Sequence, residues 1–255
     1  MSSTLNRITP WVVTLINLVF LEQIIKTPKQ VYWLGFLALT LIFLAIWQLT
    51  GRQLLSKKFW RFAITPTFLF LSGLLFLVFL EAGWLKQLFI FSLSIFGGVF
   101  LEVVFVWFWR RPRYQPNAFE NISTHLNLLT IFFTTSGLFG LIIFLNFPLW
   151  LLALIFFIIS AILNYQLIWI SDANWSTGWP YIVVITLTIT EIFLAVSFLP
   201  TSIYVSGLLV TISYYLITGL TRNWLLGIKE GKVVKRYLII SLILLAMIFL
   251  TAKWF

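Results

Sequence analysis

The chain has 255 residues, of which 61% are hydrophobic and only 9% are charged, and its mean hydropathy is +1.04. A soluble domain carries roughly 25% charged residues and needs a polar exterior, so this composition excludes a soluble globular protein. The net charge of +10 would suggest nucleic acid in a soluble protein, but basic loops facing anionic headgroups account for it in a membrane protein, and we expect no nucleic-acid partner.

Nine apolar stretches are each long enough to cross the hydrocarbon as a helix, which takes about 20 residues. Their continuous apolar character excludes the alternating strands of an outer-membrane barrel. We therefore predict an all-α, polytopic transmembrane helical bundle, in which residues 1–255 form a single integral membrane domain. The predicted spans are residues 8–25, 31–49, 62–80, 87–109, 126–145, 149–170, 179–199, 202–220 and 237–253.

The first span is short, and it contains an acidic residue. Glu22 lies four residues before Lys26, the spacing at which the two side chains pair on a helix. If this segment only lies on the membrane surface, eight spans remain and the amino terminus moves to the other side.

The lysines and arginines indicate how the spans are oriented. Thirteen of the 17 fall in residues 1–7 and in the loops 50–61, 110–125 and 221–236, which all face one side of the predicted bundle. Because basic loops stay in the cytoplasm, we predict a cell-membrane protein with a cytoplasmic amino terminus and an external carboxy terminus.

The central polar segment, residues 110–125, begins with three arginines in four positions. Arg110, Arg111 and Arg113 are candidates for binding anionic headgroups on the cytoplasmic side, because guanidinium is a forked donor that suits phosphate. Asn117 and Glu120 have capping-box spacing, so the next helix is expected to begin near residue 117. In the last basic loop, 221–236, apolar residues lie among the cations, a composition that suits a surface-lying segment.

Two carboxylates lie within predicted spans and are the main candidates for a site. Ionisable groups in hydrocarbon are expensive, so Glu102 and Glu191 are candidates for an intramembrane pathway or proton site. Helical spacing places Ser94 on the face of Glu102 and Thr188 on that of Glu191, and both faces are expected to point inward at depths that allow one shared cavity. The alternative is a neutral glutamic acid that hydrogen-bonds a neighbouring helix as structural glue.

Residues with catalytic potential are few. His125 is the only histidine, the seven acidic residues are scattered, and no Gly-rich phosphate loop is present. The chain also has no cysteine, which excludes thiolate metal sites and cysteine nucleophiles. We therefore predict no catalytic residues, no metal site and no cofactor, and the balance favours a protein that is not an enzyme.

Two functional classes fit these features. The first is a small transporter or permease-like protein with the intramembrane carboxylates near its pathway. The second is a non-catalytic scaffold or accessory subunit of an envelope or lipid-handling complex. A cavity that reaches one of the carboxylates favours the first class, and a solid bundle in which both are hydrogen-bonded to other helices favours the second.

Overall fold

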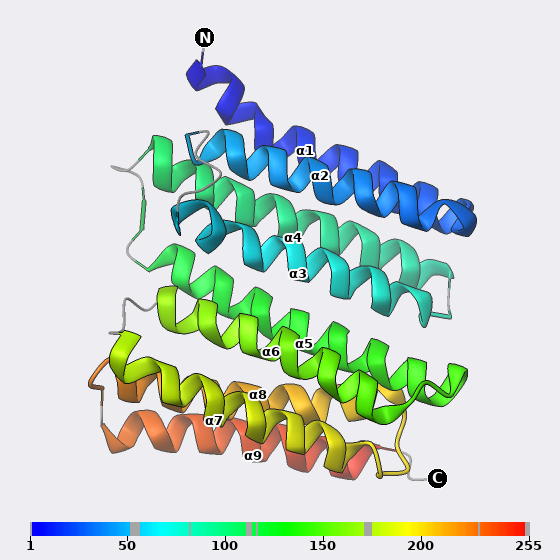
Figure 1. Ribbon diagram of the computed structural model, residues 1–255, viewed down its shortest axis with the longest axis vertical. Coiled ribbons are helices and arrows are strands. Elements are labelled where there is room, and N and C mark those ends of the chain that lie inside the picture. The colour runs from blue at the N-terminus through cyan, green and yellow to red at the C-terminus, as the bar shows by residue number, and fades with distance from the viewer. Residues whose placement is uncertain are drawn as a thin grey trace. The chain divides into compact units, whose positions relative to one another are not determined.

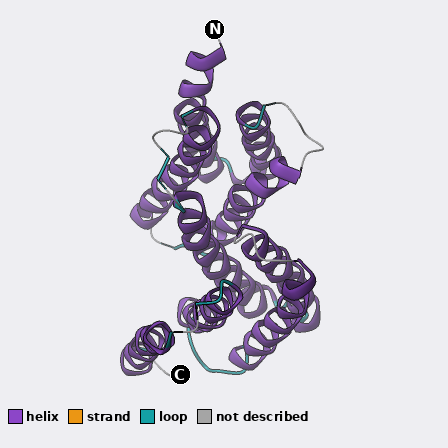
Figure 2. Cartoon of the chain, turned by 90° about the vertical axis from the view of Figure 1, so that its left-hand side faces the viewer, coloured by secondary structure: helices purple, strands orange, loops and turns teal. Residues whose placement is uncertain are grey.

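The computed structural model is almost wholly helical (Figure 1). It describes residues 2–51, 57–81, 83–110, 114–115, 117–170, 175–228 and 230–252. No strand occurs in these ranges, as the uniform helix colour of Figure 2 shows. The helices are α1 (Ser2–Lys26), the short 3₁₀ helix η1 (Pro28–Gln30), α2 (Val31–Leu49), α3 (Lys57–Val78), α4 (Gly83–Trp109), α5 (Ala118–Leu145), α6 (Leu149–Ile170), α7 (Trp175–Val196), α8 (Ile203–Leu225) and α9 (Gly231–Thr251).

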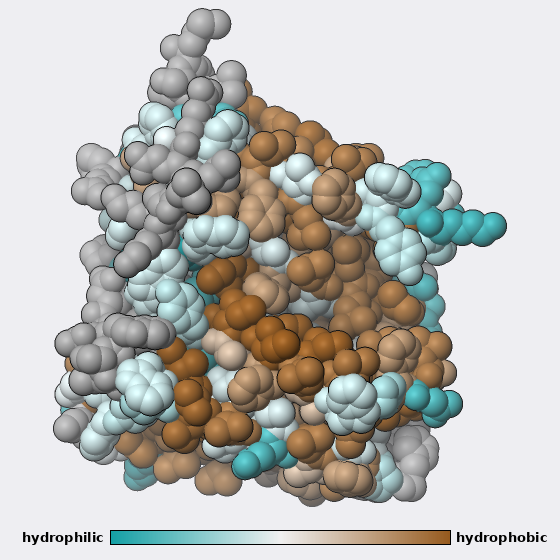
Figure 3. All heavy atoms as spheres, in the orientation of Figure 1, coloured by the Kyte–Doolittle hydropathy of each residue, from teal (hydrophilic) through white to brown (hydrophobic). Residues whose placement is uncertain are grey.

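In the described ranges, nine helices are long and apolar enough to cross a membrane. Figure 3 shows hydrophobic residues over much of one face, with the hydrophilic ones mostly toward its borders. A surface of this kind is stable against lipid, and helices satisfy their own backbone groups there. The chain is therefore a multi-pass membrane protein, and the predicted all-α transmembrane bundle with nine spans is confirmed.

Several helices extend beyond the predicted spans at their polar ends. The segment 221–236, predicted as a loop, is mostly helical because α8 continues to Leu225 and α9 already begins at Gly231, so that prediction was wrong. Hydropathy marks where a helix leaves the hydrocarbon, but backbone hydrogen bonding continues into the headgroup region, where charged side chains reach water. The helix expected near residue 117 does begin there, at Ala118.

Residues with left-handed backbone conformation follow the ends of three helices. Gly51 follows α2, Asn146 follows α5 and Gly227 follows α8, with φ values of 81°, 51° and 76°. At the end of α8 the Ile228 N–H donates to the Asn223 carbonyl at 2.9 Å, which closes a Schellman motif around Gly227. Glycine and asparagine tolerate this conformation, so these residues fix where the chain turns back.

One compact unit spans Met1–Asn127 and contains α1 to α4 with the first turns of α5. In this unit α1 packs along α4 and α2, and α3 packs against α2 and α4. The ring of Phe119, at the start of α5, lies 4.4 Å from that of Phe62 and 5.8 Å from that of Phe100. Aromatic contact therefore anchors the start of α5 to α3 and α4.

A second compact unit spans Leu128–Phe255. In it α7 packs against α6 and α8, and α9 packs along α8. The ring of Phe193 stacks on Phe139 at 4.7 Å and on Phe156 at 4.8 Å, which ties α7 to α5 and α6. The boundary between the two units falls inside α5, and the expectation of a single domain stays a prediction.

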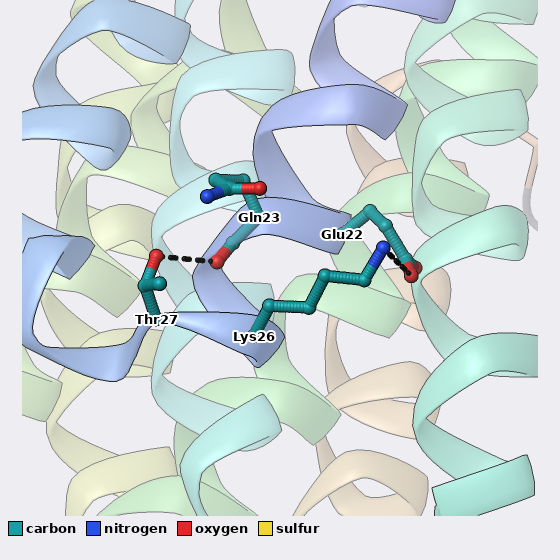
Figure 4. Close-up of polar contacts among 4 residues, drawn as sticks. All are labelled: Glu22, Gln23, Lys26 and Thr27. Carbon is teal, nitrogen blue, oxygen red and sulfur yellow. Dashed lines mark hydrogen bonds and ion pairs between the residues drawn. The ribbon is translucent and has the colours of Figure 1, made fainter.

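The last turn of α1 is held by side chains close to one another in sequence (Figure 4). Lys26 Nζ lies 3.2 Å from Glu22 Oε1, so the predicted pair is confirmed. The Thr27 hydroxyl and the Thr27 N–H both donate to the Gln23 carbonyl, at 2.9 Å and 2.8 Å. Both interactions stabilise the point where α1 gives way to η1.

A tyrosine from the preceding loop caps the start of α5. The Phe119 N–H donates to the Tyr114 hydroxyl at 2.9 Å, and this hydroxyl donates to Glu120 Oε2 at 3.3 Å. The tyrosine thus does what a side-chain N-cap does, and it also orients the acidic residue of the first turn. Burial raises the pKa of the Tyr114 hydroxyl, and the Glu120 carboxylate raises it further.

The Tyr114→Phe variant should lower the stability of the start of α5, because the Phe119 N–H loses its acceptor. A lost cap costs about 1 kcal/mol, which thermal unfolding in detergent can detect. A raised folded-state pKa means that the hydroxyl contributes its full stability below pH ~10 and loses it as the pH rises further. The difference between wild type and variant should therefore be constant from pH 6 to 9 and shrink above pH ~10. A difference that shrinks between pH 6 and 9 would contradict this role.

Candidate functional site

One face of α1 carries polar side chains that are buried within the first unit. Asn6, Thr9 and Asn17 are 5%, 8% and 8% exposed. They follow at i, i+3 and i+11, so they share one helix face with the buried Leu21. The polar part of this face extends over roughly 16 Å at 1.5 Å per residue.

The opposing face belongs to α4. Ser94, Gly98 and Glu102 follow at i, i+4 and i+8, and Ser94 and Gly98 are buried whereas Glu102 is half-buried. Gly98 is essential to the packing, because a Cβ atom there would collide with the hydroxyl oxygen of Thr14. Close approach of two helices at a small residue is common in membrane bundles, and here it brings the two polar faces together.

Two contacts fix the register between α1 and α4. Thr14 lies against Gly98, and Glu22 hydrogen-bonds Gln87. Residue numbers rise along α1 as they fall along α4, so the helices are antiparallel. Glu102, one turn beyond Gly98, is then level with Pro10, one turn before Thr14.

The amide of Gln48 on α2 extends the polar face toward the start of α1. Its Nε2 donates to Asn6 Oδ1 at 2.9 Å and to Thr9 Oγ1 at 3.1 Å. Pro10 follows directly and has no N–H to donate to the carbonyl of Asn6. Polar groups therefore continue from the start of α1, past the level of Glu102, to Asn17.

A small cavity of about 20 Å³ lies beside this polar face, lined by residues of α1, α2, α3 and α4. Its polar walls include Thr14, Asn17 and Ser94, and Pro66 of α3 forms part of another wall. A water needs ≳ 10–15 Å³ of such space, so the cavity has room for one or two waters or a small ion.

Three buried oxygen atoms at this place have no hydrogen-bond partner among the described residues. They are Asn17 Oδ1, Ser94 Oγ and Glu102 Oε2. An unsatisfied buried group costs about 1–3 kcal/mol, so each of the three stands to gain from a bound species. The amide oxygen only accepts, the hydroxyl both donates and accepts, and the carboxyl accepts when ionised and donates when protonated. Asn17 and Ser94 line the cavity and can bind water or a small hard cation there, whereas Glu102 lies two turns along α4 from Ser94 and can bind a proton.

The second unit places its candidate carboxylate differently. Glu191 is exposed, and so is Ala195, whereas Thr188 is half-buried. The inward face expected for Glu191 was therefore wrong. Helical spacing tells which residues share a face but not where that face points, and α7 is oriented by Ile189 and Phe193, which are 0% exposed on its opposite side. Glu102 and Glu191 belong to separate units, and the cavity shared by both stays a prediction.

Of the candidate headgroup-binding arginines, the structure describes Arg110, which directly follows α4. Arg110 is half-buried, with its guanidinium carbon 5.8 Å from the centre of the Phe105 ring. Arg111 and Arg113 lie outside the described residues. In the part of the chain that the structure describes, no three His, Asp or Glu side chains come together where they could hold a metal ion.

Sequence reasoning identified the α4 half of the site and missed the α1 half. Asn17 and Thr14 were not singled out, although Asn6, Thr9 and Asn17 have the spacing of one helix face. Searching each predicted span for polar residues that share a face, rather than for charged residues alone, would have found them.

The packing at Gly98 can be tested against its neighbour. Gly98→Ala should lower the unfolding temperature in detergent, because the new methyl group meets Thr14 and overpacking costs about 1–3 kcal/mol. Gly97→Ala is the matched control, since a Cβ there meets nothing within 4 Å and alanine favours a helix more than glycine. Equal stability of the two variants would contradict the close approach of α1 and α4.

Comparison with protein families matches residues 46–251 to the family described as a protein of unknown function (DUF5656). No curated protein and no solved structure matches the chain. The matched segment begins near the end of α2 and ends with α9, so it includes Glu102 and Glu191 but not α1. Because this segment takes in most of the chain, the protein belongs to the DUF5656 family.

Proposed function

We propose that the protein is a small transporter or permease-like membrane protein that binds a proton or a small hard cation beside Glu102. The observation that carries this proposal is a pair of unpartnered buried oxygens, from Asn17 and Ser94, at a cavity with room for a small ion, together with the unpartnered Glu102 Oε2 two turns further along the same face of α4. Carboxylate, amide and hydroxyl oxygens are the ligands that hard cations prefer. An ionisable group that is retained inside a bundle is functional more often than not.

The polar face of α1 is the access route that we propose for this site. Gln48, Asn6 and Thr9 lie toward the start of α1, and Asn17 lies deeper. A species that enters from the amino-terminal side meets hydrogen-bonding groups along about 16 Å of helix. Beyond Asn17 the same face continues with Leu21 and Ile24, which are apolar and buried, so the route closes there. This arrangement suits a site that is open to one side at a time.

In the proposal, Glu102 acts through its protonation state: the ionised carboxylate accepts hydrogen bonds, and the protonated acid can donate one. The ionised carboxylate attracts a cation into the oxygen-lined cavity, and the protonated acid can instead donate to a neighbouring oxygen. A proton and a cation therefore compete for one position, which is the simplest basis for coupled exchange.

The alternative is a non-catalytic scaffold or accessory subunit in which Glu102 is a permanently neutral hydrogen-bond donor. In that case the carboxyl should remain protonated whatever the pH or the salt, and glutamine should replace it fully. The unpartnered state of Glu102 Oε2 within the described chain favours the binding function over this one.

Infrared difference spectroscopy separates the two functions without a known substrate. In wild-type protein in lipid, raising the pH or adding Na⁺ should remove a carboxylic-acid carbonyl band. Glu102→Gln should lack this change while it unfolds within a few degrees of wild type, because a neutral amide conserves shape and hydrogen bonding. Glu81→Gln, outside the spans, is the matched control and should keep the change. An unchanged titration in Glu102→Gln would remove the proposal.

We also propose the orientation with a cytoplasmic amino terminus in the cell membrane, on the basis of the distribution of cations. In that orientation Arg110, Arg111 and Arg113 face the cytoplasmic leaflet and contact anionic headgroups. Each such cation contributes about 1 kcal/mol of attraction.

Labelling of single cysteines tests this orientation, because the natural chain has none. A membrane-impermeant thiol reagent added to intact cells should modify Gln30→Cys, which lies in the connection after α1, and should not modify Gln115→Cys, which lies between α4 and α5. Both positions are exposed, so accessibility does not bias the result. The reverse pattern would invert the topology.

A further inference from the structure

The uncovered face of α7 carries a carboxyl group among apolar side chains. Glu191 lies between Leu187, which is 47% exposed, and Ala195, with Val184 one turn further back at 60%. These residues follow at i, i+3, i+7 and i+11, so they form one stripe along the helix. The stripe lies opposite the face that packs against α6 and α8 through Ile189 and Phe193.

The depth of Glu191 makes this arrangement expensive in lipid. It lies within the apolar span Gly178–Val196, twelve residues after Trp179 and therefore about 18 Å along the helix. The nearer end of the span, Val196, is five residues or about 8 Å away, but side chains on a helix lean toward its amino terminus, so the carboxylate is directed away from that end. In the part of the chain described, Glu191 has no hydrogen-bond or ion-pair partner. Intramembrane carboxyls are retained where something pairs with them.

The chain itself offers no cation at this depth. No lysine or arginine occurs between Arg113 and Arg222, so a second copy that docked through the same stripe would set acid against acid. Lipid chains offer neither a charge nor a hydrogen-bond donor. A cation that pairs with Glu191 at this depth would therefore come from another protein. Ala195 lies one turn from Glu191 and is exposed, and its small side chain allows a second helix to approach closely.

We propose that the Glu191 stripe of α7 docks a transmembrane helix of a partner protein that carries a lysine or arginine side chain at the level of Glu191. The ammonium or guanidinium pairs with the carboxylate, and the apolar residues on either side pack against the partner helix. This assignment concerns the second unit alone and does not depend on cation binding near Glu102.

A designed peptide can stand for the partner helix. The full-length protein, labelled with a donor dye at Gln115→Cys, is placed in phosphatidylcholine vesicles with an acceptor-labelled Leu/Ala transmembrane peptide that has one lysine at the depth of Glu191. The control peptide has leucine at that position. Energy transfer should show about tenfold tighter association with the lysine peptide, as a hydrogen-bonded polar pair in membranes predicts.

Variants of the protein complete the test. Glu191→Gln, at an exposed position, should fold normally and bind the lysine peptide no better than the leucine peptide. Glu81→Gln should keep the full preference. Equal binding of the two peptides to wild type, or an undiminished preference in Glu191→Gln, would overturn the proposal. So would self-association of the protein that Glu191→Gln abolishes, because the stripe would then bind a second copy.

Discussion

Polar groups in hydrocarbon must find their partners inside protein, and this requirement governs every level of the structure. It makes each span a helix, because only a helix satisfies its own backbone within one segment. It also explains why the hydroxyl groups of Thr40, Ser92 and Thr251 donate to carbonyls one turn back in their own helices. Against this background, Asn17, Ser94 and Glu102 each have a buried oxygen with no partner among the described residues, and the proposed binding site rests on these atoms.

The two intramembrane glutamates both need a partner for their carboxyl groups, but they lie in different surroundings. Glu102 is half-buried on the face of α4 that meets α1 at Gly98, where Thr14 brings the two polar faces together. Glu191 turns away from the helices that pack around α7. A small species entering from water can complete the first environment, and only a group embedded in the membrane can complete the second. The two proposals, a small species at Glu102 and a partner helix at Glu191, therefore follow from the different surroundings of the two carboxyl groups.

Hydropathy predicted the fold well because polar side chains in hydrocarbon cost free energy and are therefore rare within spans. The nine spans could be predicted from the sequence alone for this reason. The ends of the helices could not be predicted in this way, because the apolar pattern stops at the edge of the hydrocarbon while the backbone hydrogen bonds continue. The extension of α8 to Leu225 is an example. For the site, spacing identified Ser94 with Glu102 but could not supply Asn17, which lies on another helix. It also could not tell that the Glu191 face points outward, because the direction of a face depends on tertiary packing.

The family match covers the α4 side of the Glu102 site but not the α1 side. Residues 46–251 include the α4 face with Ser94 and Glu102, whereas α1 and its polar residues precede the match. Thr14 lies against Gly98 of this face, and Asn17 lines the cavity together with Ser94. The α1 helix therefore supplies two of the polar residues, Thr14 and Asn17, that line the cavity. Asn17 is the buried residue of α1 whose side-chain oxygen has no partner in the described chain. If the proposed binding beside Glu102 needs Asn17, it is a property of the α1–α4 pair, and otherwise it is a property of α4 alone.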